Sequence, residues 1–210
     1  MRIKKFIMDC LDSNSYLIYG SEECYIVDIG GENISQLTDF ITENGLKPKG
    51  IFLTHGHIDH IAGINKVLKA YPEIKLYISE NESEFLHNKL LNLAVHFPNY
   101  GFDFQGEDNV VTVSDGELIN SKFEIIATPG HTAGSISIYY EEGNIVFTGD
   151  TMFKNSIGRT DLPTGNYREI WKSLKKLVRL PENTAVLPGH GEESDIKTER
   201  KSLFEGEDYI

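Results

Sequence analysis

Cysteine is scarce in this sequence of 210 residues. Cys10 and Cys24 are its two cysteines, and they lack the spacing of a Cys-x-x-Cys pair. Two cysteines are too few for the disulfide framework of a small secreted domain. We therefore expect both side chains to be reduced thiols in a cytoplasmic protein.

Basic residues are few compared with acidic ones. The chain has 20 Lys and Arg against 32 Asp and Glu, a formal net charge of −12 at pH 7. This charge repels the phosphate backbone of a nucleic acid and an anionic membrane surface alike. We expect neither a nucleic acid nor a membrane as partner, although bound metal ions would still create a compact positive site.

Long hydrophobic runs are also missing. Residues 1–8 begin like a signal peptide, but Asp9 and Asp12 interrupt the apolar run before it reaches secretory length. No later stretch is long and apolar enough to predict a transmembrane helix. A Gly-x-Ser-x-Gly motif, which holds the nucleophilic serine of many hydrolases, is absent as well. The sequence therefore does not support a serine-nucleophile mechanism.

The residues that are present are those of a globular protein with alternating strands and helices. Hydrophobic residues make up 40% and charged residues 25% of the chain, which allows a substantial core. The alternation of strand and helix patterns predicts an α/β fold. Two predicted hairpins, at residues 15–27 and 136–148, resemble each other loosely. We therefore predict one domain over residues 1–210 with two similar halves, about 1–108 and 109–210.

Local signals place several further elements. Asn166 followed by Glu169 resembles a capping box, and an apolar stripe then continues until Pro181 stops the helix. Apolar spacing predicts helices at residues 34–43 and 61–71, short strands at 50–53 and 184–187, and a last amphipathic segment around residues 196–204.

Residues 80–109 fit this alternation poorly. The segment begins with a helical pattern and continues into a run rich in aromatic residues. Long loops in compact domains often act as lids over functional sites. Aromatic side chains packed beneath a loop are an equally good interpretation, and the sequence leaves both open.

A dense group of metal-binding residue types follows the predicted strand at residues 50–53. Four candidate ligands occur within six positions, in the order His-x-His-x-Asp-His: His55, His57, Asp59 and His60. A chance match is expected roughly 4 × 10⁻⁴ times in a chain of this composition, so coincidence is a poor explanation. Two imidazoles separated by one residue in an extended loop can hold one ion, and the last two residues can face a second.

Three more candidate ligands come just after predicted strands. They are His131, Asp150 and His190, and each lies beside a glycine. Loops at the carboxyl ends of strands are where α/β folds build their sites, so their joint placement points to one centre. His87 and His96 lie outside this pattern, and we interpret them as structural or surface residues.

The order of these residues resembles that of metallo-β-lactamase-fold metallohydrolases over residues 10–195. The resemblance implies a four-layered αββα sandwich. It also implies two metal ions, one bound by His55, His57 and His131 and the other by Asp59, His60 and His190, with Asp150 between them. The family also has an Asp behind the metal loop, where this chain has Asp28. That residue is expected either to orient a ligand histidine or to serve a turn.

Within the family, the sequence resembles the short bacterial members of the hydroxyacylglutathione hydrolase (glyoxalase II) branch. The similarity lies in residues 149–153 and 156–163. The commonest β-lactamases of this family carry Arg where this chain has His60, which argues against that activity. Full-length glyoxalase II enzymes continue with a helical domain that binds glutathione, whereas this sequence continues for about twenty residues beyond His190. The sequence therefore leaves the thiol of the substrate open.

The resemblance implies an enzyme that hydrolyses a small anionic thioester or activated ester with a metal-bound hydroxide, oriented by Asp59. We expect zinc in both sites, with iron or manganese as alternatives. A thiolate is a stable leaving group, so the reaction needs a general acid less than amide hydrolysis does. Lys154 and Arg159 are candidates to bind a substrate carboxylate, although Arg159 could equally pair with Asp161.

The main alternative is an oxidoreductase of the same fold. Persulfide dioxygenases share the Gly-Arg-Thr-Asp stretch and hold one iron, which here would be bound by His55, His131 and Asp150. A small phosphoester or lactone substrate stays open, and a metal-free interaction module is the non-enzymatic alternative. The sequence does not address the oligomeric state.

Overall fold

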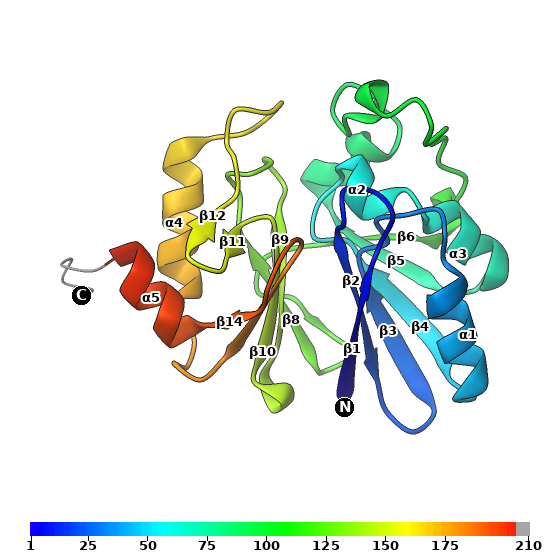
Figure 1. Ribbon diagram of the computed structural model, residues 1–210, viewed down its shortest axis with the longest axis horizontal. Helices are drawn as coiled ribbons and strands as arrows, with labels where there is room; N and C mark the ends of the chain where they lie inside the picture. The colour runs from blue at the N-terminus through cyan, green and yellow to red at the C-terminus, as the bar shows by residue number, and fades with distance from the viewer. Residues whose placement is uncertain (205–210) are drawn as a thin grey trace. The chain divides into compact units, whose positions relative to one another are not determined.

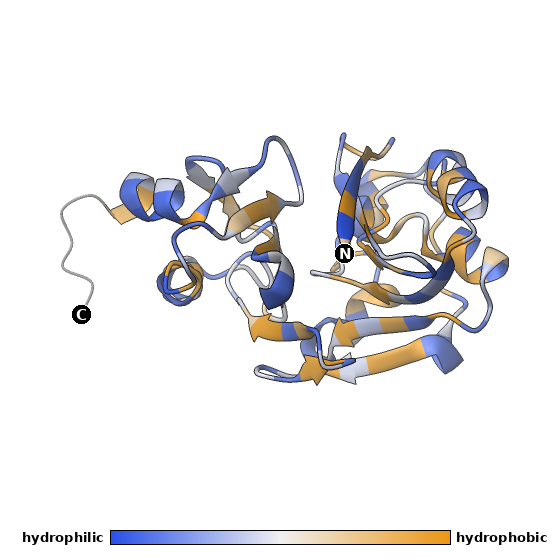
Figure 2. Cartoon of the chain, turned by 90° about the horizontal axis from the view of Figure 1, so that it is seen from below, coloured by the Kyte–Doolittle hydropathy of each residue, from blue (hydrophilic) through white to orange (hydrophobic). Residues whose placement is uncertain are grey.

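The structure, a computed structural model, describes residues 1–204 and divides the chain into two compact units, with the boundary between Ser114 and Asp115. Each unit has one six-stranded sheet and its own helices. Most strands are largely hydrophobic, while the helices carry apolar and hydrophilic residues on different sides (Figure 2). The α/β pattern expected from the sequence is therefore present in each unit.

The sheet of the first unit has the strand order β1-β2-β3-β4-β5-β6 (Figure 1). The pairs β1–β2 and β2–β3 are antiparallel, and β3 to β6 run parallel. The strands are β1 (Arg2–Ile7), β2 (Asn14–Tyr19), β3 (Glu23–Val27), β4 (Lys47–Phe52), β5 (Lys75–Ser79) and β6 (Val110–Val113). The first predicted hairpin is confirmed as β2 and β3. Because β3 and β4 are parallel neighbours, the loops that follow them begin at the same edge of the sheet.

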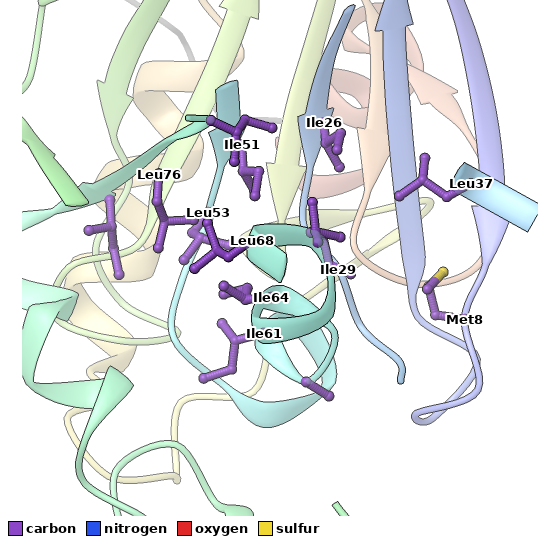
Figure 3. Packing of buried hydrophobic residues seen from close by; sticks show 14 of the residues in the cluster. Met8, Ile26, Ile29, Leu37, Ile51, Leu53, Ile61, Ile64, Leu68 and Leu76 are labelled. Carbon is purple, nitrogen blue, oxygen red and sulfur yellow. The ribbon is translucent and has the colours of Figure 1, made fainter. Parts of the chain in front are cut away.

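Three helices of the first unit contribute to one hydrophobic cluster with the sheet: α1 (Ser35–Glu43), α2 (Ile58–Ile61) and α3 (Ile64–Ala70). Figure 3 shows Leu37 of α1 and Leu68 of α3 in this cluster, with Ile26 and Ile51 from neighbouring strands. The other side of the strands is buried too, and its Phe52 ring stacks on Tyr77 at 5.1 Å. Burial on both faces explains why these strands lack an alternating polar pattern.

The helix predicted at residues 61–71 is interrupted. α2 ends at Ile61 and α3 begins at Ile64, while the N–H of Gly63 donates to Ile29 O at 3.0 Å. A Cβ atom at Gly63 would lie 2.2 Å from Gly31 O, so only glycine permits this close approach. The apolar spacing thus predicts the helical residues correctly, but a tertiary backbone contact breaks the helix in two.

The irregular segment at residues 80–109 is built from short 3-10 helices, η1 (Glu80–Leu86), η2 (Ala94–His96) and η3 (Glu107–Asn109). Several of its apolar side chains, among them Leu86, Phe102 and Phe104, belong to the core cluster of the first unit. These contacts support the interpretation of aromatic side chains packed beneath a loop.

The sheet of the second unit has the strand order β14-β13-β10-β9-β8-β7. Of its neighbouring pairs, β10–β13 is parallel and the others are antiparallel. The strands are β7 (Leu118–Ile119), β8 (Phe123–Ala127), β9 (Ile136–Tyr140), β10 (Ile145–Gly149), β13 (Ala185–Pro188) and β14 (Ser194–Asp195). The second predicted hairpin is confirmed as β9 and β10, joined by the 3-10 turn η4 (Glu141–Gly143). A small separate sheet pairs β11 (Met152–Phe153) with β12 (Ser156–Ile157).

The helices of the second unit are α4 (Tyr167–Leu177) and α5 (Ile196–Phe204), as the apolar spacing predicts. The Asn166 side chain caps α4 by accepting from the N–H groups of Arg168 and Glu169. The reciprocal half of the capping box is wrong: the Glu169 side chain bonds Lys172, and the N–H of Asn166 donates to Gly130 O. Its expected apolar stripe packs in the core of this unit.

The two units share a connection pattern. In the first, an antiparallel hairpin (β2, β3) is followed by α1 and by β4, which runs parallel to β3. In the second, β9 and β10 are followed by α4 and by β13, which runs parallel to β10. The likeness of the two hairpin sequences thus extends to the following helix and strand.

Cys10 and Cys24 are both buried free thiols. Burial raises the pKa of Cys10 to about 11 and that of Cys24 to about 12. Because the thiolate is the reactive form, neither side chain should react with a disulfide reagent such as DTNB at about pH 8 in the native state. We expect both to react at once after unfolding in urea. One rapidly reacting thiol in the native protein would contradict this prediction.

Among residues 1–204, no helix combines the length and the apolar character needed to cross a lipid bilayer.

Candidate metal centre

The His-x-His-x-Asp-His motif follows strand β4 of the first unit and runs into α2. All four candidate ligands are buried, the most exposed being Asp59 at 8%. The ring of His55 lies 4.8 Å from that of His57 and 4.1 Å from that of His60, measured between centroids. Three imidazoles gathered in one loop are the kind of nitrogen ligand that divalent zinc, iron or manganese binds.

Asp28 follows the neighbouring strand β3 and holds this motif in place. Its Oδ1 accepts from the N–H of Thr54 at 2.8 Å, and its Oδ2 accepts from His60 Nδ1 at 2.8 Å. A carboxylate only accepts hydrogen bonds, so the His60 proton lies on Nδ1 and the lone pair lies on Nε2. Of the two expectations for Asp28, the structure supports the orienting role.

Thr54 fixes the tautomer of His55 in a similar way. Its hydroxyl donates to Asp28 Oδ2 at 2.7 Å, and its Oγ1 lies 3.1 Å from His55 Nδ1. Because the hydroxyl proton is used by Asp28, the oxygen accepts from His55 Nδ1. His55 therefore also presents an Nε2 lone pair, the tautomer that a metal ion requires.

The second unit holds the other three candidates. His131 Nδ1 donates to Arg159 O at 2.8 Å, which again leaves the lone pair on Nε2. Asp150 follows β10, and His190 follows its parallel neighbour β13. Asp150 Oδ2 lies 3.7 Å from His131 Nε2 and 3.8 Å from His190 Nε2.

These separations suit a metal ion better than direct hydrogen bonds. A hydrogen bond between such groups would span about 2.7 to 3.2 Å. Two atoms that each bind one ion at about 2.0 to 2.2 Å are separated by about 3 to 4 Å. His60 Nε2 and Asp59 Oδ2 in the first unit also lie 3.8 Å apart. The residues of each unit, imidazole nitrogens and carboxylate oxygens, fit divalent zinc, iron or manganese.

The two predicted substrate contacts lie in ion pairs. Lys154 donates a hydrogen bond to Glu192, and this contact raises the pKa of the lysine. The guanidinium of Arg159 donates two hydrogen bonds of 2.8 Å to the carboxylate of Asp161. These hydrogen bonds from Arg159 hold the pKa of Asp161 at about 2. The Arg159–Asp161 pairing considered from the sequence is therefore present.

Replacing Arg159 with alanine should move the pKa of Asp161 upward from about 2. Because the pKa of the Asp161 carboxyl is lowered, the ion pair is fully formed at pH values above the usual pKa of an aspartate. It is lost as the pH falls through about 2. The change is measured by NMR titration of the Asp161 side-chain carboxyl. Lys172→Ala, which removes a partner of Glu169 instead, should leave the Asp161 titration unchanged.

Two polar residues behind the motif were not identified from the sequence. Thr54 directly precedes the motif and is not a metal-ligand type, and Glu82 lies in the irregular segment at residues 80–109. Glu82 is 26 positions away from Gly56, whose N–H it accepts at 2.8 Å. No local signal connects residues so far apart. His87 and His96 are exposed, in agreement with their interpretation as surface residues.

The sequence matches a known protein family and two relatives that are similar over almost their full length. Residues 8–190 match the family described as the metallo-beta-lactamase superfamily. The chain belongs to that superfamily. It is 36% identical to the probable metallo-hydrolase YqgX of Bacillus subtilis over 95% of both chains. It is 33% identical to the hydroxyacylglutathione hydrolase GloC of Haemophilus influenzae over 96% of both chains.

Solved structures agree with this assignment. The BLEG-1 B3 metallo-β-lactamase matches with a TM-score of 0.87 and 31% identity, covering 95% of this chain and 97% of that one. TTHA1623, solved in a di-iron-bound form, matches with a TM-score of 0.83 and 28% identity, covering 95% and 98%. The expected metallo-β-lactamase fold, an α/β sandwich, is thereby confirmed.

Proposed function

We propose that this member of the metallo-β-lactamase superfamily is a metal-dependent hydrolase of small anionic thioesters or activated esters, with an activity like that of hydroxyacylglutathione hydrolase. The observation that carries the proposal is the set of three histidines whose Nδ1 atoms are tied to acceptors: His55, His60 and His131. An imidazole fixed in this tautomer is prepared to bind a metal ion. The similarity to GloC supports the choice of substrate class.

We assign seven residues to two divalent ions. His55, His57 and His131 would hold one ion, Asp59, His60 and His190 would hold the other, and Asp150 would contribute to both. Zinc is the first choice, while the relative solved in a di-iron-bound form supports iron as a second one. Bound ions of this kind lower the pKa of water toward about 7 and polarise a carbonyl group.

The residues of this chain then orient the reaction. Asp59 accepts a hydrogen bond from the attacking water and fixes its direction toward the carbonyl carbon. Asp28 and Thr54 keep the ligand rings of His60 and His55 in one tautomer during turnover. A thiolate leaves without a dedicated proton donor, because its conjugate acid has a pKa of about 8.5.

Lys154 and Arg159 are proposed to bind the carboxylate of the substrate. Both side chains are exposed and already pair with the acidic residues Glu192 and Asp161. Exposed ion pairs are weak, so a substrate carboxylate can replace these partners at little cost. Arg159 is suited to this exchange because its guanidinium binds a carboxylate through two parallel hydrogen bonds.

The proposal includes a cytoplasmic location and no nucleic-acid partner. The two buried free thiols are consistent with a reducing compartment. The net charge of −12 disfavours binding to a phosphate polymer.

The decisive experiment is elemental analysis of protein purified without added metal, combined with hydrolysis of S-lactoylglutathione followed by absorbance. Two divalent ions per chain and measurable hydrolysis are the expected results. The same protein is assayed with a chromogenic cephalosporin, because BLEG-1 is a β-lactamase, and for oxygen uptake with a thiol persulfide. Faster β-lactam hydrolysis, or one iron per chain with oxygen uptake, would replace the thioesterase assignment.

A further inference from the structure

The segment from η1 to Asn92 lies directly against the loop that carries His55 and His57. Glu82 Oε2 accepts the N–H of Gly56 at 2.8 Å, and the backbone O of Asn92 accepts the N–H of Ile58 at 2.8 Å. The Phe85 ring lies 6.0 Å from the His57 ring, between centroids. Three contacts from one segment thus fall on three consecutive residues, 56–58, of the candidate metal loop.

The contact from Glu82 is the most unusual of the three. Its side chain is 1% exposed, and a buried carboxylate is costly unless specific partners compensate for the lost hydration. A charge-assisted hydrogen bond to a backbone N–H is shorter and stronger than a neutral one. Gly56 lies between two candidate ligands, so the direction of its peptide group affects where both imidazoles point.

Packing against the same segment also limits the position of this loop. A Cβ atom at Gly56 would lie 2.3 Å from Phe85 Cβ, so the backbone touches the segment without room for a side chain. Phe85 O in turn accepts a hydrogen bond from Asn92 Nδ2 at 2.7 Å, which links η1 to the end of the segment. Phe85 prevents the loop from moving toward the segment, and Glu82 opposes movement away from it.

We propose that Glu82 is a positioning residue of the metal site. Through Gly56 it holds the backbone between His55 and His57 in the geometry that lets both rings bind the same ion. This inference rests on the proposed function, because it assumes that these histidines bind a metal. A merely structural Glu82 would contribute to folding and leave metal affinity unchanged.

The test compares three variants of the full chain. Glu82→Leu removes the acceptor at similar size, and Glu82→Gln keeps an acceptor oxygen. Leu86→Ala is the matched control, because Leu86 is buried in the same 3-10 helix and packs in the core of the unit. Zinc affinity is measured by competition with a chromogenic chelator, and the stability of the metal-free proteins by urea unfolding.

We expect Glu82→Leu to weaken zinc binding about tenfold, the lower end of the effect of removing outer partners of metal ligands. Glu82→Gln should weaken zinc binding less than Glu82→Leu, because its amide oxygen can still accept from the Gly56 N–H. Leu86→Ala should lower stability and keep wild-type affinity. Unchanged affinity in Glu82→Leu, or equal losses in Glu82→Leu and Leu86→Ala, would overturn the inference while the proposed function stands. A wild-type protein that binds no zinc, iron or manganese would overturn both.

Discussion

Replacing Asp150 with alanine should slow the hydrolysis of S-lactoylglutathione by at least about 10³-fold. The carboxylate lies 3.7 Å from His131 Nε2 and 3.8 Å from His190 Nε2, so it is expected to bind the same ions as these histidines. Metal ions contribute several kcal/mol to stabilising charge in such reactions, and each 1.36 kcal/mol is about tenfold in rate. Metal content should fall together with the rate.

Glu193→Gln is the matched control for this prediction. Glu193 is an exposed acid in the loop after His190, so the change removes one negative charge near the site without removing a proposed ligand. We expect it to keep nearly the full rate and metal content. If Asp150→Ala kept more than about a tenth of the wild-type rate with full metal content, Asp150 would not be a ligand.

Replacing Asp28 with alanine should lower the free energy of unfolding of the metal-free protein by about 3 to 5 kcal/mol, because it leaves several buried hydrogen-bond donors without an acceptor, at about 1 to 3 kcal/mol each. Its carboxylate accepts three hydrogen bonds: from the Thr54 N–H, from the Thr54 hydroxyl and from His60 Nδ1. Asp28 also has a φ of 55°, a left-handed conformation that alanine adopts at a cost. Urea unfolding followed by circular dichroism measures the change.

Asp28→Asn separates the backbone contribution from that of the hydrogen bonds. Asparagine tolerates the left-handed conformation and keeps one acceptor oxygen, so about half of the loss should remain. Zinc affinity should fall in both variants, because His60 and His55 lose their fixed tautomers. Equal stability of Asp28→Ala and the wild type would mean that this network contributes nothing to folding.

Local patterns predicted several elements of this protein. The two hairpins and the helices α1, α4 and α5 follow from the spacing of apolar residues and from Asn166 as a cap, all within a few positions of the chain. Such signals depend only on residues close together in the chain, so they can be recognised without knowing the tertiary contacts. The candidate ligands could be identified from the sequence for the same reason, since four of them lie in six positions and the others follow predicted strands.

Contacts between distant residues could not be predicted in this way. Gly63 divides a regular helical pattern because its backbone meets the loop after β3. The aromatic residues at 97–104 gave no sign of whether they covered a site or filled a core, and Phe102 and Phe104 are buried in the core. The pairing of Lys154 with Glu192, 38 positions away, was likewise decided by the tertiary structure.

The sequence by itself determined the α/β class, the identity of the metal-binding residue types and their order along the chain. The tertiary structure alone decided how these residues are held: Asp28 on His60, Thr54 on His55, the Arg159 carbonyl on His131 and Glu82 on Gly56. The physical reason is that a ligand type is a property of one residue. The tautomer of a ligand histidine and the direction of its ring depend instead on hydrogen bonds to the ring or to the loop that carries it. In three of these four cases the two bonded residues are 26 to 32 positions apart, and folding alone brings them together.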